Sequence, residues 1–213
     1  AGQGITGAKL TGNYNTAIGN DAGLLLQGAA NSNTLVGAYA GDSLTTGSTS
    51  TAVGFEALST QAAYSENTAL GYRALKATNG GYSNTAVGHE TLLSNIDGLN
   101  NTAVGHDAGM FATTADGSTF IGHEAGQGIT GTKLTGNYNT AIGQQAGLLL
   151  QGTANANTLV GAAAGDNITT GDFNIVIGSG YDADSATADS QLNIGGWIKG
   201  SAGQITMPSQ PAF

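Results

Sequence analysis

Three histidines occupy one recurring position and are the residues best suited to metal chemistry. They lie directly after the glycine that ends a repeated motif: His89, His106 and His123. An acidic residue follows each of them, and imidazole with carboxylate suits divalent transition ions. Other copies place Asn, Ala, Phe, Tyr or Gln at this position, which favours a tolerant surface column. We therefore predict no metal and no other cofactor, and keep this histidine column as the weak candidate.

A second group of chemically suggestive residues lies near the C-terminal end. Asp182, Asp184 and Asp189 cluster there, and enzymes that cleave polysaccharides use two carboxylates roughly 5–10 Å apart. These acids lie in a Ser/Ala/Asp-rich stretch with no aromatic groove beside it in sequence, which favours a solvated loop. The Gly-Gly-x-Gly-x-Asp nonapeptides of calcium-binding repeats are absent. We predict that the protein is not an enzyme.

The residues that must position these side chains belong to a short repeated motif. Asn84-Thr85-Ala86-Val87-Gly88 recurs in close variants along the whole chain, with its glycines mostly 17 residues apart, twice 18 and once 21. A motif held at one period indicates a stack of equivalent units. The motif glycines, which we expect to turn the chain, are Gly19, Gly37, Gly54, Gly71, Gly88, Gly105, Gly122, Gly143, Gly161, Gly178 and Gly195.

Alternation along the motif puts Thr and Val on one face of a strand, and Asn, Ala and Gly on the other. We expect a first strand of about five residues and a second of three or four in each unit, burying the Val or Ile, an Ala and sometimes a Leu. The recurring Thr could suggest an ice-binding face, but burial or ladder hydrogen bonding is favoured. We expect a stacked amide ladder at Asn15, Asn33, Asn67, Asn84, Asn101, Asn139, Asn157 and Asn174.

Composition narrows the function classes. Gly accounts for 36 of 213 residues and charged residues for only 9%, against roughly 25% in ordinary soluble domains. The net charge of −9 disfavours binding to nucleic acid, since phosphate neutralisation needs clustered Lys and Arg. The absence of Cys removes disulfides and thiolate chemistry. No apolar run is long enough for membrane insertion.

These observations predict an all-β fold, a parallel β-solenoid or β-roll of about ten 17-residue repeats, with neighbouring units about 4.8 Å apart. Because each unit buries little, we expect a homotrimer, intertwined or side by side. We divide the chain into a repeat shaft over 1–178, a terminal capping repeat over 179–200 in which Trp197 covers the last unit, and the truncated start of a following domain over 201–213. The superunit 1–124 is partly repeated from 125, and the chain opens inside a repeat, so we expect a piece of a longer polypeptide.

The Asn-Thr-Ala-Val-Gly-x-x-Ala-Leu repeats resemble those of bacteriophage tail-fibre shafts. They are also similar to the head repeats of trimeric autotransporter adhesins, which form left-handed parallel β-rolls in homotrimers, although the unit here is longer. Residues 185–200 resemble the segment that closes such repeats in phage fibres, and residues 207–213 resemble the opening of a trimeric jelly roll of the complement C1q type.

The resemblance implies a structural protein of the virion, the shaft of a tail fibre. Such a shaft extends and trimerises a distal receptor-binding head for host attachment. Its implied partners are two further copies of itself, other tail proteins and, through a distal domain, carbohydrate or protein of the host surface. The alternatives are the head of a bacterial trimeric surface adhesin, which is extracellular, and a polysaccharide-cleaving tailspike.

Overall fold

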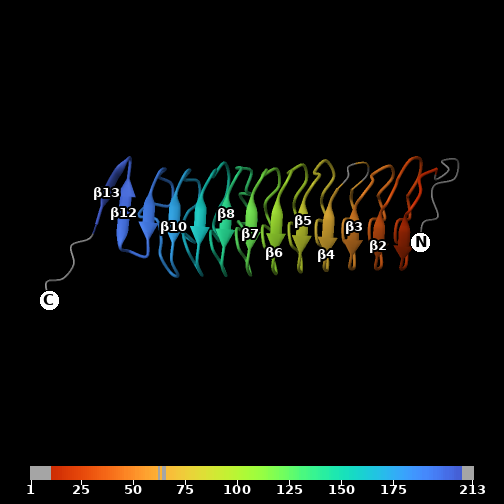
Figure 1. The fold of residues 1–213 in the computed structure, drawn as a ribbon, viewed down its shortest axis with the longest axis horizontal. Coiled ribbons are helices and arrows are strands. Elements are labelled where there is room, and N and C mark those ends of the chain that lie inside the picture. Colours follow the sequence, from red (N-terminus) through yellow and green to blue (C-terminus); the bar gives the residue numbers. More distant parts are fainter. Residues whose placement is uncertain (1–10, 62, 64–65, 208–213) are drawn as a thin grey trace.

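A single stack of coils forms the protein. The computed structural model describes residues 11–61, 63 and 66–207. In these residues there is no helix, and thirteen short strands form one sheet in chain order, β1 to β13. Figure 1 shows the coils side by side along one long axis, from β1 near the N-terminal end to β13 near the C-terminal end. The predicted all-β, parallel solenoid of about ten turns with a repeat of ~17 residues is confirmed.

Each coil contributes one strand to this sheet, and equivalent motif residues pair across it. Thr85 pairs with Thr102 and Val87 with Val104, in parallel. The parallel strands are β1 (Thr16–Ile18), β2 (Thr34–Val36), β3 (Thr51–Val53), β4 (Thr68–Leu70), β5 (Thr85–Val87), β6 (Thr102–Val104), β7 (Thr119–Ile121), β8 (Thr140–Ile142), β9 (Thr158–Val160), β10 (Ile175–Ile177) and β11 (Leu192–Ile194).

The expected strand lengths are wrong. Each parallel strand has three residues rather than five, and turns replace the second strand that we expected in each coil. The reason lies in the backbone: beyond each motif glycine, residues such as Glu90 (φ 50°) and Leu92 (φ 51°) adopt left-handed conformations. A left-handed residue reverses the local chain direction and cannot continue an extended strand.

The two faces of the strands also differ from expectation. The middle strand residue is fully buried in β2 to β10, as at Ala86 and Ala103, whereas the residues on either side of it are half-buried or exposed. The alternation was correctly predicted, but the expected burial of Val and Ile was wrong, and the Thr side chains, for which burial or ladder hydrogen bonding was favoured, are not buried. The motif Asn lies inside the coil, where its amide bonds turn carbonyls, and the period of two then places Ala inside and Thr and Val outside.

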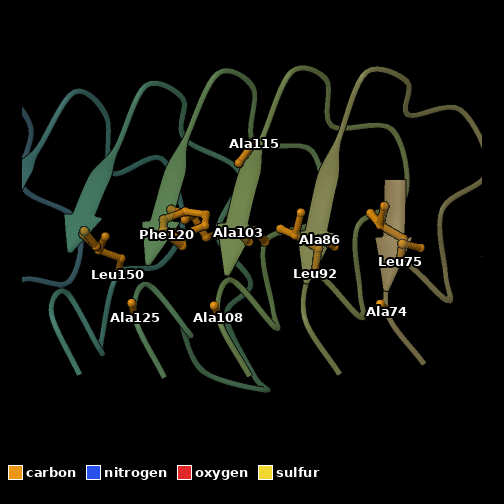
Figure 2. Packing of buried hydrophobic residues seen from close by; sticks show 14 of the residues in the cluster. Ala74, Leu75, Ala86, Leu92, Ala103, Ala108, Ala115, Phe120, Ala125 and Leu150 are labelled. Carbon is orange, nitrogen blue, oxygen red and sulfur yellow. The ribbon is translucent and has the colours of Figure 1, made fainter. Parts of the chain in front are cut away.

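The core is thin, and in several coils a small residue in one column accompanies a large residue in the other. Where the strand carries Ala52, Ala69 or Ala86, the turn carries a buried leucine, Leu58, Leu75 or Leu92. Where the strand carries a large residue, the turn carries glycine; a Cβ on Gly126 would lie 2.1 Å from Cδ1 of Phe120. Figure 2 shows Phe120 filling the interior between Leu92 and Leu150, along a line of buried alanines. The leucines and glycines at this turn share one left-handed backbone conformation, so they are interchangeable there.

An amide ladder runs along the interior from Asn15 to Gln191. The Oδ1 atom of Asn84 accepts the backbone N–H of Asn101 (2.9 Å), and its Nδ2 donates to the Gly98 carbonyl (2.8 Å). Ser50 and Ser118 occupy the same column, and their hydroxyl oxygens accept the N–H of the next coil. Most ladder bonds therefore join a side chain to the backbone of a neighbouring coil, in addition to the amide-to-amide bonds that we expected.

The motif glycines form a second column in which backbones approach closely. Gly88 has φ +141°, and a Cβ built on it would lie 2.3 Å from the Gly105 carbonyl oxygen. Its N–H donates to the Leu70 carbonyl of the preceding coil (2.8 Å). Glycine is required because a side chain would meet both the strained φ and the next coil.

At the C-terminal end the sheet changes direction. β12 (Ile198–Ser201) pairs antiparallel with β11, and β13 (Gln204–Thr206) pairs antiparallel with β12. Trp197 precedes this hairpin and is 70% exposed, so β12 rather than the indole covers the last parallel strand. The division at 178 and 200 stays a prediction, and residues 1–10 and 208–213 lie outside the described residues.

Candidate functional site

The position after each motif glycine forms a surface column. The glycine turns the chain out of the strand, and the second residue beyond it adopts a left-handed conformation, as in Asp107 (φ 57°). The N–H of Asp107 donates to the His89 carbonyl of the preceding coil (2.9 Å), which fixes the spacing of neighbouring corners. Side chains at this corner therefore repeat at the coil spacing and stand one above another.

Aromatic rings occupy this corner in five consecutive coils, from Phe55 to His123, and Tyr39, which lies one residue further along its own coil, extends the column by an edge-to-face contact. Ring centroids lie 5.9 Å apart for Tyr39 and Phe55, and 5.6 Å for Phe55 and Tyr72. The stack continues into the histidines, with 4.9 Å between Tyr72 and His89. We call this set the ring column: Tyr39, Phe55, Tyr72, His89, His106 and His123.

The histidines thus lie where the sequence places them, in register on three consecutive coils. The His89 and His106 rings are 4.6 Å apart and nearly parallel, at 4°. His106 and His123 are 5.3 Å apart and tilted by 31°. Each imidazole is close to half exposed, so solvent and solutes reach all three.

Charged side chains form a parallel column beside the rings. Arg73 bridges Glu56 (2.8 Å) and Glu90 (3.3 Å) of the two neighbouring coils, and Lys76 binds Glu56 at 2.6 Å. The Lys76 ammonium and then Arg73 hold the pKa of the Glu56 carboxyl below its usual value. The Arg73 guanidinium also lies 5.0 Å from the Tyr72 ring centre, where a cation is attracted by the ring face. Sequence reasoning missed this ladder, although Glu and Arg alternating at the coil spacing was its signal.

Beyond Arg73 the acidic column faces the histidines. Nδ1 of His106 lies 3.3 Å and Nδ1 of His89 3.8 Å from Oδ1 of Asp107. Nδ1 of His123 lies 3.6 Å from Oε2 of Glu124. Within the described residues, His89, His106 and Asp107 are the one group of three side chains whose donor atoms could together hold a metal ion.

The C-terminal acids do not converge on one point. Asp184 binds Lys199 (2.9 Å), and Asp189 accepts the backbone N–H of Asp172 (2.8 Å). Asp182 interacts instead with Asp166. Burial, and then the bond to Asp182 and its charge, raise the pKa of the Asp166 carboxyl. Asp166 was not among the predicted residues; its signal is its equivalence to Asp42 in the first superunit copy, a carboxyl whose pKa burial also raises.

The outward face of the strands carries an apolar line that sequence reasoning placed in the core. It runs beside the Thr column on β1 to β10, and its members are half-buried to 59% exposed. We call it the aliphatic stripe: Ile18, Val36, Val53, Leu70, Val87, Val104, Ile121, Ile142, Val160 and Ile177. A continuous apolar line on the surface of an elongated protein typically marks an interaction surface.

No helix able to cross a membrane occurs in the part of the chain that the structure describes. The chain matches no protein-family profile, no curated protein and no solved structure. The features of the molecule that bear on its function are therefore the solenoid, its ring column and its aliphatic stripe.

Proposed function

We propose that this chain is a structural fibre, the shaft of a phage tail fibre in which three copies associate along their length. The observation that carries this proposal is the aliphatic stripe. It lies on one face of a straight stack whose coils repeat at the strand spacing, and no charged residue interrupts the strands β1 to β10. Half-buried or exposed aliphatic side chains at every level from β1 to β10 favour burial against a partner of equal length.

The repeat spacing favours another copy of this chain as the partner. A stripe of ten side chains at the spacing of parallel strands is matched at every level only by a surface with the same spacing. Three such stripes around one axis would bury the apolar side chains, and a closed ring of three leaves no stripe exposed. The thin core of each coil gives the same preference, since association adds apolar burial that a single column lacks.

The chemistry of the surface supports a mechanical role rather than a catalytic one. The three C-terminal acids bind different partners, and the amide ladder and glycine column are internal to the stack. A shaft of this kind sets the distance between virion and cell and holds three distal heads together, which raises avidity through multivalency. In this proposal, a distal domain outside the shaft contacts host carbohydrate or protein.

Native mass spectrometry tests the association. We expect a species of three times the 21.0 kDa chain mass. Changing Val104 and Ile121 to Lys places charge in the centre of the stripe and should give monomers. Ile96→Lys is the matched control, because Ile96 is equally exposed (41%) but lies in a turn outside the strands. A wild-type monomer, or trimers that persist in the double variant, would remove the proposed association.

Location distinguishes the shaft from the adhesin head. Antibody raised against this chain should label the fibres of virions under electron microscopy. Labelling of the bacterial envelope in cells without phage particles would favour the adhesin. Depolymerisation of host polysaccharide by the purified chain, lost in Asp182→Asn or Asp166→Asn, would favour the tailspike.

A further inference from the structure

We propose that His89, His106 and Asp107 form a binding site for one divalent transition-metal ion, with zinc, nickel or copper as the fitting class. This site goes beyond the structural role, and all its donors come from one chain, so it does not depend on the proposed association. One donor atom from each side chain lies within 4.8 Å of the other two. Two imidazole nitrogens and one carboxylate oxygen suit these ions, whereas calcium and magnesium prefer oxygen alone.

The three donor atoms need to move only slightly closer together to bind one ion. Donor atoms about 2.1 Å from a tetrahedral ion lie about 3.4 Å from one another. The two Nδ1-to-Oδ1 distances, 3.3 and 3.8 Å, already match this spacing. The imidazoles are 45% and 50% exposed, so their rings can turn on the surface without disturbing the core.

Asp107 is the fixed member of the site. Its Oδ1 atom is buried and has no hydrogen-bond partner, while both imidazoles turn Nδ1 toward it. Buried polar atoms are normally paired, so this carboxylate oxygen has a free coordination position that an ion would fill. Gln127 donates from Nε2 to the other carboxylate oxygen, Oδ2 (3.3 Å), and holds the group in place, as residues around metal ligands do.

The third histidine lies outside the site and provides a control. His123 is tilted away from His106, and its nearest acid is Glu124 rather than Asp107. Oε2 of Glu124 accepts a hydrogen bond from Gln145 (2.8 Å). Unlike Asp107, Glu124 is not among the described residues that have a buried oxygen without a hydrogen-bond partner. Spacing along the chain treats the three histidines alike, but the structure separates two of them from the third.

The ion would join two consecutive coils, since His89 and His106 are 17 residues apart on neighbouring levels. Bound to the folded chain alone, it would stabilise the stack in proportion to its concentration. Metal binding would therefore resist fraying at the middle of the shaft, around β5 and β6.

Isothermal titration with ZnCl2 and with NiCl2 on the full chain tests the site. We expect one ion per chain, and at least a tenfold loss of affinity in His106→Gln and in Asp107→Asn. His123→Gln should stay within twofold of the parent chain. Glutamine occupies this corner naturally at Gln144, so the histidine variants are compatible with the fold. Circular dichroism with unchanged unfolding in the absence of metal shows that each variant is folded.

Two outcomes overturn the proposal. The first is no saturable binding up to millimolar metal. The second is an equal loss in His123→Gln and His106→Gln, which would mean that ions bind any exposed imidazole. Proton NMR of the imidazoles adds an independent measurement: zinc should shift the ring signals of His89 and His106 and leave those of His123 in place.

Discussion

Replacement of Asn84 by Ala measures what the amide ladder contributes. In the folded chain the Asn84 side chain accepts the buried N–H of Asn101 and donates from Nδ2 to the Gly98 carbonyl and to Oδ1 of Asn67. Alanine removes all three bonds. The Gly98 carbonyl keeps a second donor in Asn95, and Oδ1 of Asn67 keeps the Asn84 N–H, so the one group left without a partner is the Asn101 N–H.

These contacts determine how much unfolding free energy the Asn84→Ala substitution should remove. Two lost donations cost about 1 kcal/mol each, and a buried N–H without an acceptor costs about 1–3 kcal/mol more. We therefore expect Asn84→Ala to lower the free energy of unfolding by about 3–5 kcal/mol. Serine keeps an acceptor for the next N–H, as Ser50 and Ser118 do in the native ladder. Asn84→Ser should then lose only the two donations, about 2 kcal/mol.

Hydrogen exchange measures the loss of stability locally, at the Asn101 amide, and urea unfolding measures it for the whole chain. The Asn101 amide should exchange at least about 100-fold faster in Asn84→Ala, because each 1.4 kcal/mol of opening energy is about a tenfold change. Asn79→Ala, at an exposed turn, is the matched control and should lie within about 0.5 kcal/mol of the parent chain. A loss in Asn84→Ala no larger than in that control, or an equal loss in Asn84→Ser and Asn84→Ala, would show that the amide ladder does not stabilise the stack through these bonds.

Three further substitutions test the stack. Gly88→Ala should destabilise it by about 3 kcal/mol or more in urea unfolding, because the new Cβ combines a left-handed φ with a clash against the next coil; an unchanged midpoint would contradict the glycine column. Phe120→Ala should cost about 3–5 kcal/mol, and adding Gly126→Leu should recover part of this by restoring the Ala-with-Leu pairing of other coils; a double variant no more stable than Phe120→Ala would refute this pairing of small with large residues. Asp166→Asn should stabilise the fold at pH 7. The pKa of Asp166 is raised in the folded state, so its folded-state penalty appears as pH rises from the ordinary 3.8 through the folded pKa and is full above it. The gain in stability of Asp166→Asn over the parent chain should vanish well below pH 3.8. Urea unfolding midpoints measured against pH test this, with Asp97→Asn, at an exposed position, as the control.

Sequence periodicity was sufficient to predict the architecture because the repeat is local. A motif returning every 17 residues can stack only on its own neighbours, and alternation within it requires an extended segment. The column of Asn84 and its equivalents, the glycines that turn the chain and the register of the histidines all follow from that rule.

Tertiary structure decided which face is inside. Alternation is symmetric between the two faces of a strand, so it separates Ala86 from Val87 without saying which is buried. Hydrophobicity alone favours Val, and that expectation was wrong, because the asparagine amide reaches turn carbonyls only from inside the coil. The apolar surface that suggests association was therefore invisible until the coils were closed.

The candidate metal site likewise has features that the repeat predicts and features that only appear in the folded structure. Equal spacing in a repeat means equal position in each coil, so the shared column of His89, His106 and His123 could be predicted from the repeat alone. The folded coils were needed to reveal that two of them face a buried, unpartnered oxygen of Asp107, whereas the third lies beside Glu124, which Gln145 holds. The physical reason is that side-chain direction and burial depend on neighbours one coil away, which spacing along the chain does not encode.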